Sequence, residues 1–225
     1  AACSPAICVV LDGVIVSPDW AVSPMHTLSS PGTVAVAVAV QDVQAGKVSY
    51  GIDARVFSRP NKLRGGRVEA EQASDSCAGP TLACGFYRRK TVLSLGGWNE
   101  ALDDSVADFE FARALHTLGQ SCVCDIHSAV QIISGAPSRK LSPLALSQLS
   151  SLSIAHGDRQ VGMMDGLKSL LADCLTGNVL QGVAWAKGKR DTSTIRRTQM
   201  RLAHAKQQLA ALAQEDQTLR IFPAQ

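Results

Sequence analysis

Aromatic and charged residues are both scarce in this sequence. Phe, Trp and Tyr together make up 4% of its 225 residues, and Asp, Glu, Lys and Arg make up 18%. So few aromatic side chains argue against a protein that binds single-stranded nucleic acid by stacking its bases. The formal net charge of +3 is small and dispersed, so we expect no nucleic-acid partner.

Long apolar runs are missing as well. None approaches the roughly 18–20 residues that a membrane-spanning helix needs. The N-terminus has neither the basic flank nor the apolar stretch of a signal peptide. We therefore expect a soluble protein.

The cysteines form no recognisable framework. Their number is odd and no two are spaced Cys-x-x-Cys: Cys3, Cys8, Cys77, Cys84, Cys122, Cys124 and Cys174. We interpret them as mostly reduced and buried, because free cysteine packs as a small hydrophobe; a disulfide framework is the alternative. Reduced cysteines fit a cytoplasmic location.

Apolar residues, at 46%, are frequent enough for a folded domain with an appendage. Residues 6–11 form a short apolar run that ends at Asp12, which predicts a buried strand with a polar residue at its carboxyl end. Ligands of open α/β sheets bind at that end. Val34 to Val40 alternates Val and Ala without a polar face, so we expect a central strand covered on both sides.

The remaining elements follow from periodicity, caps and Gly/Pro punctuation. We expect further strands over 47–57, 81–86, 121–124 and 129–133, a loop over 58–67, and helices over 17–28, 88–95, 105–118, 143–155, 163–175 and 194–219. Residues 1–137 then form an α/β domain, and residues 138–225 an all-helical extension.

The last predicted helix carries a heptad pattern. Its two stripes are Ile195, Leu202 and Leu209, and Thr198, Ala205, Leu212 and Leu219. Such stripes are typical of a short coiled coil, so residues 194–219 either join two copies in a homo-oligomer or pack onto the same chain. The basic residues around this helix, Lys187 to Lys206, form a solvated face or contact an anionic membrane surface.

One block carries a family resemblance. From Thr81 a small-residue strand leads into an Arg-bearing helix, a Gly-Gly-Trp turn and an acidic loop, followed by Asp108 in a helix that ends at Gly119. This order resembles the acceptor half of family 2 glycosyltransferases of the GT-A fold. Upstream, Ile7 to Trp20 looks like the strand of that family that ends in its Asp-x-Asp motif.

The resemblance covers about residues 6–133 and implies a truncated GT-A-like mixed sheet. The family's first half, a nucleotide-binding α/β unit, has no counterpart here, and the chain begins at Ala1 without a methionine. We therefore expect the donor-binding half to have been removed, to be encoded elsewhere or to have been lost in evolution.

Two residues match functional positions of the family, and a third is a candidate because of its charge. Asp108 matches the general base, and we expect it in the first turn of its helix, where the macrodipole keeps a carboxylate ionised; a helix-capping role is the alternative. Asp12 matches the first acid of Asp-x-Asp and would contact the donor. Arg88 would stabilise the donor diphosphate, or else lie on a solvated helix face.

The metal ligand of the family is replaced. The second acid of Asp-x-Asp is Val14, which offers a divalent cation no oxygen, and the acid that normally precedes the base is Ala107. We expect no metal in this chain, and Mn²⁺ or Mg²⁺ only if the donor half is supplied elsewhere.

The acceptor pocket is better preserved. Its predicted residues supply close backbone approach, a flat apolar face and hydrogen-bonding groups: Gly97, Trp98, Asn99, Glu100, Asp103 and Asp104. Trp98 is alternatively a core aromatic. We expect transfer of a sugar from a nucleotide sugar to a carbohydrate hydroxyl, with inversion; the alternative is a non-catalytic relative that binds carbohydrate or serves assembly.

Overall fold

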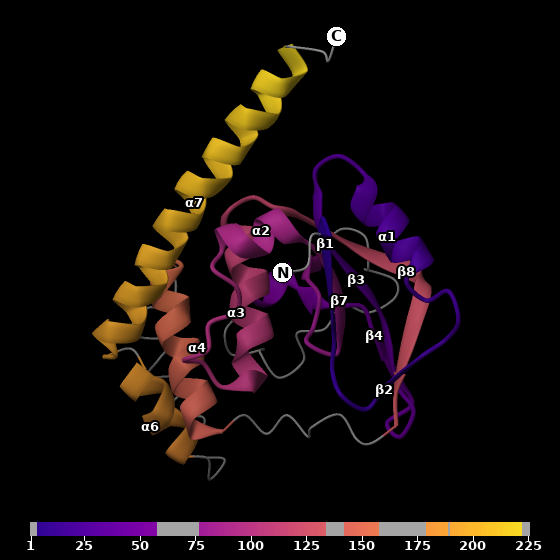
Figure 1. Ribbon diagram of the computed structural model, residues 1–225. Helices are drawn as coiled ribbons and strands as arrows, with labels where there is room; N and C mark the ends of the chain where they lie inside the picture. The colour runs from indigo at the N-terminus through magenta and orange to yellow at the C-terminus, as the bar shows by residue number, and fades with distance from the viewer. Residues whose placement is uncertain (1–3, 58–76, 134–141, 158–178, 189, 222–225) are drawn as a thin grey trace.

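The computed structural model describes residues 4–57, 77–133, 142–157, 179–188 and 190–221 (Figure 1). A mixed sheet carries helix α1 (Val22–Ser29) on one face, and α2 (Arg89–Ser94) and α3 (Asp104–Thr117) on the other. The C-terminal helices form a further layer outside α3. The predicted α/β class with a helical C-terminal part is confirmed.

The main sheet has six strands in the order β1-β7-β3-β8-β2, with β4 paired to the end of β3. Their bounds are β1 Ala6–Val10, β2 Val14–Val16, β3 Thr33–Asp42, β4 Lys47–Ser49, β7 Cys84–Arg88 and β8 Ser121–Ile132. The central strand β3 is parallel to β8 and antiparallel to β7. A separate two-stranded sheet joins β5 (Ile52–Asp53) to β6 (Cys77–Gly79).

Strand β3 has no polar face because both of its faces are covered. Val36 and Val38 pack with Leu28 of α1, whereas Ala35 packs with Phe111 of α3 on the opposite face. Because successive side chains of a strand point to opposite faces, the larger side chains of Val36 and Val38 pack against α1 and the smaller side chain of Ala35 packs against α3. The predicted central strand is confirmed.

Predicted strand bounds differ from the structure in three places, and the simplest case is the strand at 81–86, which is β7 and runs from Cys84 to Arg88. The separate strands at 121–124 and 129–133 are one strand, β8, whose pairing with β3 is interrupted by a register shift between Val38 and Ala39. The single strand at 47–57 is broken into β4, β5 and a 3₁₀ turn (Ala54–Val56). The break lies at Gly51, whose φ is +96°.

Replacing Gly51 with alanine tests that break. A Cβ there would lie 2.7 Å from the Gly79 carbonyl oxygen and 2.9 Å from the Ala37 Cβ, so we expect a loss of at least about 2 kcal/mol in unfolding free energy. Gly46→Ala is the matched control, because its φ is also positive but nothing lies within 4 Å. Urea denaturation of both variants checks this, and equal losses would contradict the steric argument.

Helix starts also differ from the prediction. Helix α1 begins at Val22 rather than near Ser17, after a turn in which Asp19 has a φ of 60°. Helix α3 begins at Asp104, so Asp108 lies in its second turn rather than its first. The macrodipole at Asp108 is therefore weaker than we expected.

The C-terminal helices are α4 (Pro143–Ala155), α6 (Val179–Gly188) and α7 (Thr192–Ile221). Helix α4 has the predicted bounds, and Ser142 caps it by accepting a hydrogen bond from the Ala145 amide at 3.0 Å. Three predictions fall outside the described residues: the helix at 163–175, the loop at 58–67 and the boundary at 138.

Helix α7 packs onto its own chain. Thr198 and Ala205 of its stripe are buried, and Ala205 joins the core cluster of Tyr87 and Phe111. The C-terminal end of α7 projects beyond the rest of the molecule (Figure 1). Among the helices in the described ranges, none is both long and apolar enough to cross a membrane.

Candidate functional site

Two carboxylates predicted to act in sugar transfer lie at the same end of the sheet. The amide of Leu11 donates to the Ala83 carbonyl at 3.1 Å, which places Asp12 beside the turn that precedes β7. The amide of Leu82, in the same turn, donates to Asp108 Oδ2 at 3.3 Å. Asp12 and Asp108, which are 96 positions apart in the sequence, are thus brought to the same turn.

The two carboxylates differ in their exposure. Asp12 is exposed, whereas Asp108 is 2% exposed and also accepts a hydrogen bond from the Phe109 amide at 2.7 Å. Tyr87 is buried nearby, and burial, followed by the negative charge of Asp108, raises the pKa of its hydroxyl. The Asp108 carboxylate is therefore closed off from solvent in this structure.

The predicted acceptor residues lie in a loop from Leu95 to Asp103, which we call the acceptor loop. Trp98 stacks on Phe111 with ring centroids 4.6 Å apart and 18° between the planes, and meets Tyr87 edge-on at 5.3 Å. The structure therefore packs one face of the Trp98 ring against a core aromatic, as the alternative prediction for this residue expects.

Polar groups of the same loop bind neighbouring helices. Asp103 receives a hydrogen bond from Ser142 Oγ at 3.2 Å, and its amide donates to Gln148 Oε1 at 2.8 Å. Asn99 Oδ1 accepts from the Ala101 amide within the loop. Glu100 is exposed. Asp104 begins α3, and its side chain is outside the described part of the structure.

Arg88 is not brought to Asp12 and Asp108. Ala6 pairs with Arg88, whereas Val10 pairs with Cys84, so Arg88 lies at the opposite end of β1 and β7. Its guanidinium donates to the carbonyls of Leu28, Ser30 and Thr33, fastening the end of α1 to the sheet. The structure gives Arg88 this structural role, at the end of the sheet away from Asp12.

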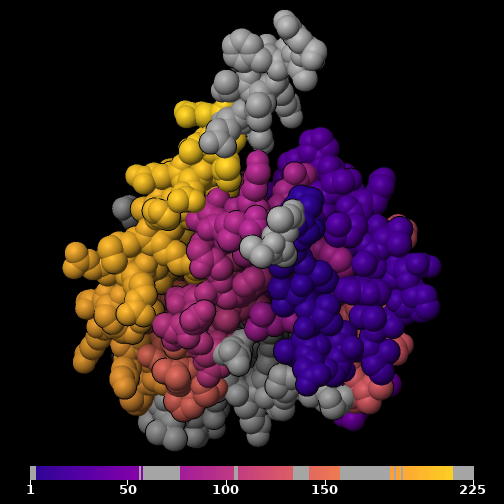
Figure 2. Space-filling model, viewed as in Figure 1, coloured from indigo at the N-terminus to yellow at the C-terminus, as the bar shows by residue number. Residues whose placement is uncertain are grey.

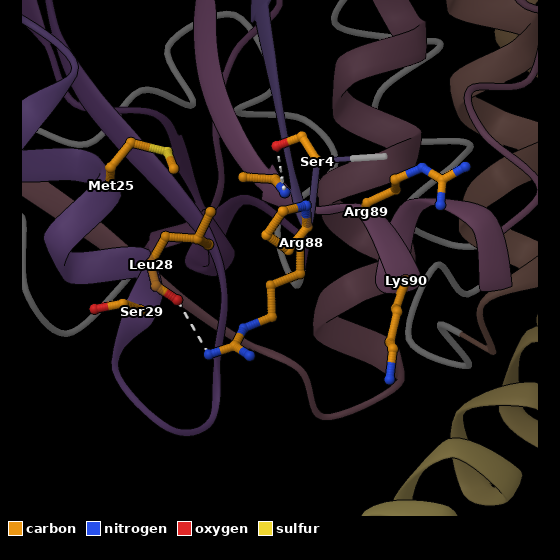
Figure 3. Close-up of a pocket in the computed structure, with 9 residues that line it drawn as sticks. Ser4, Met25, Leu28, Ser29, Arg88, Arg89 and Lys90 are labelled. Atoms are coloured by element: carbon orange, nitrogen blue, oxygen red, sulfur yellow. Dashed lines mark hydrogen bonds between the residues drawn. The ribbon is translucent and has the colours of Figure 1, made fainter. Parts of the chain in front are cut away.

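Arg88 also lines a hollow of about 540 Å³ with Arg89 and Lys90 (Figure 3). Leu28 and Met25 of α1 form its apolar side. The hollow lies at the far end of β1 from Asp12, so we do not include it in the candidate site.

The residues near Asp12 do not fit a metal ion. Val14 belongs to β2 and pairs with Ile132 in the sheet. Within the described ranges, no three His, Cys, Asp or Glu side chains come together as a possible metal site. We derive no step of the chemistry through a metal.

A buried ion pair that the sequence did not predict lies beside the acceptor loop. Arg201 of α7 donates to Glu110 Oε2 at 2.6 Å, and Glu110 is 0% exposed. Burial raises the pKa of Glu110, and Arg201 opposes this shift. The prediction that Arg201 belongs to a solvated basic face is wrong.

A signal for this pair was present in the heptad pattern. Arg201 lies three residues after Thr198 and one before Leu202, on the side of α7 that faces the protein. Glu110 binds Arg201, and the guanidinium of Arg113, which also belongs to α3, lies over the Phe57 ring at 5.4 Å.

The comparisons with known proteins add no relative to this description. No protein-family model matches the chain, and searches of curated proteins and of solved structures also return no match.

Proposed function

We propose that this chain is the acceptor-side part of a glycosyltransferase-like protein, with Asp108 as general base. The proposal is supported by one observation above all: Asp12 and Asp108, predicted separately from two motifs, lie at the same turn. The mixed sheet with helices on both faces is consistent with it.

In the proposed reaction, the Asp108 carboxylate takes the proton of an acceptor hydroxyl as the hydroxyl oxygen attacks the anomeric carbon. The bond from that carbon to the diphosphate breaks, and the nucleoside diphosphate leaves with the bonding electrons. Because Asp108 is buried, this chemistry requires the turn at Leu82 to open on substrate binding, as loops of many enzymes do.

The donor would be bound on the β1 side. Within the described part of the chain, β1 pairs only with β7, so its other edge is free for a further strand. Val10 and Leu11 at its carboxyl end are exposed apolar side chains. We propose that the nucleotide-binding half extends the sheet at this edge.

Asp108→Asn tests the proposal. Removing the base should lower turnover by about 10²–10⁴-fold. Asn keeps one acceptor oxygen for the Leu82 or the Phe109 amide, and circular dichroism checks that the fold is retained. The assay measures nucleoside diphosphate released from a panel of nucleotide sugars by the chain joined to its donor-side half. Asp191→Asn is the control, because this residue precedes α7 outside the sheet and its side chain only caps that helix, which asparagine also does. Full activity of Asp108→Asn would refute the proposed role.

A second candidate is a non-catalytic relative that binds carbohydrate or serves assembly. The burial of Asp108 and the packing of Trp98 favour it, as does Val14 in place of a metal ligand. This candidate predicts no binding of nucleoside diphosphates with or without Mn²⁺ or Mg²⁺. Calorimetry that detects metal-dependent binding at micromolar concentration would exclude it.

A further inference from the structure

The acceptor loop is held by two helices of the C-terminal part rather than by the sheet alone. At its start, Arg201 of α7 donates through Nε to the Leu95 carbonyl at 2.8 Å and through Nη2 to the Gly97 carbonyl. At its end, Gln148 of α4 donates to the Ala101 carbonyl at 3.1 Å and accepts from the Asp103 amide. Trp98 and Asn99 lie between these anchors.

At the start of the acceptor loop, Arg201 donates to carbonyls that accept no hydrogen bond from the turn after α2. After α2, Gly96 and Gly97 have φ values of +71° and +75°, and their amides donate back to Leu93 and Val92. The carbonyls of Leu95 and Gly97 have no such partner within the turn, as is usual at helix ends. Arg201 supplies donors to both.

Only an arginine fits these contacts. Three acceptors, the Leu95 and Gly97 carbonyls and the Glu110 carboxylate, meet three different nitrogens of one planar guanidinium. Glu110 is buried on α3 and fixes the guanidinium from the opposite side. A lysine ammonium, which is a single point of charge, cannot reproduce this fork.

We propose that α7 is a strap that shapes the acceptor loop, with Arg201 as its positioning residue. In the space-filling view, α7 lies directly against the segment that contains α2 and the loop (Figure 2). Because the same helix continues into the projecting end, a displacement of α7 is transmitted through Arg201 to the backbone on which Trp98 sits. The meaning of this coupling for acceptor binding rests on the proposed function; the coupling itself does not.

Hydrogen exchange measured by NMR tests the strap. In Arg201→Gln we expect the amides of Gly96 and Gly97 to exchange at least about tenfold faster, with β3 amides unchanged. Arg197→Gln, an exposed arginine on the same helix, should change neither. In Arg201→Lys, the exchange rates of Gly96 and Gly97 should lie closer to those of Arg201→Gln than to those of the unmodified chain, on a logarithmic scale.

A second variant distinguishes the contacts of Gln148 from those of Arg201. Gln148→Ala should speed exchange at Asp103 and leave Gly96 and Gly97 as in the unmodified chain. The strap is refuted if Arg201→Gln leaves Gly96 and Gly97 unchanged. It is also refuted if all amides accelerate together, since Arg201 would then only stabilise the whole fold.

Activity distinguishes this inference from the proposed function. If the chain transfers sugar, Arg201→Gln should raise the acceptor KM at least about tenfold with little change in kcat, because it moves the loop and not the base. The proposed function is refuted if the protein is inactive or if Asp108→Asn keeps full activity. If Arg201→Gln nevertheless speeds exchange at Gly96 and Gly97, the inference about α7 still holds.

Discussion

Replacing Phe111 with alanine should lower the unfolding free energy by about 3–5 kcal/mol. Phe111 is 1% exposed on α3 and belongs to the core cluster that joins the sheet, α2, α3 and α7. It stacks on Trp98 at 4.6 Å and meets Tyr87 edge-on at 5.5 Å. The substitution removes these contacts and leaves a cavity between rigid neighbours, which cannot close around it.

Denaturant unfolding followed by far-UV circular dichroism measures this effect. Phe111→Leu keeps most of the volume and should lose less than half as much stability. Leu93→Ala, on the exposed side of α2, should change the free energy by less than about 0.5 kcal/mol. A loss in Phe111→Ala no larger than that of Leu93→Ala would show that the ring does not link these elements.

The sequence predicted best those elements whose signals are local. The Val and Ala alternation of β3 needs no partner to be recognised, and Ser142-Pro143 marks the start of α4 by capping alone. The continuous strand β8 was missed because its length is set by pairing with β3, across a register shift that no local pattern shows.

The candidate site was predictable in its residues but not in its contacts. Asp12 and Asp108 were predicted from motifs, yet the turn that joins them is visible only after β1 and β7 are paired. Arg88 illustrates the converse, since its three carbonyl acceptors come from a turn more than fifty residues earlier. Arg201 and Glu110 are separated by 91 positions, so the heptad pattern can indicate that Arg201 faces the protein but cannot identify Glu110 as its partner.

Acidification should destabilise the fold through His156, and neutral glutamine at this position should remove much of that effect. His156 follows α4, and its Nδ1 lies 2.8 Å from Thr117 Oγ1 of α3. Burial, and then the positive charges of Arg113 and Arg201, lower the pKa of its imidazole to about 3. The same imidazole in the unfolded chain has a pKa of about 6.5.

Between these two pKa values, the unfolded chain binds a proton that the folded protein does not. Stability therefore falls as the pH drops below about 6.5 and stops falling, for this group, near pH 3. Between pH 7 and pH 4 the loss should be about 3 kcal/mol. The raised pKa of Glu110 acts in the opposite direction, because the folded protein then holds a proton that the unfolded chain has released.

Urea unfolding at a series of pH values, on the unmodified chain and on His156→Gln, separates the two groups. Glu110 is present in both proteins, so its contribution cancels in the difference between their unfolding free energies. That difference should shift by about 3 kcal/mol from pH 7 to pH 4 in favour of the glutamine variant. His204→Gln, on an exposed position of α7, should follow the unmodified chain. Parallel curves for the unmodified chain and His156→Gln would mean that His156 accepts a proton in the folded protein as readily as in the unfolded chain. The partial burial of its imidazole and the positive charges of Arg113 and Arg201 argue against this.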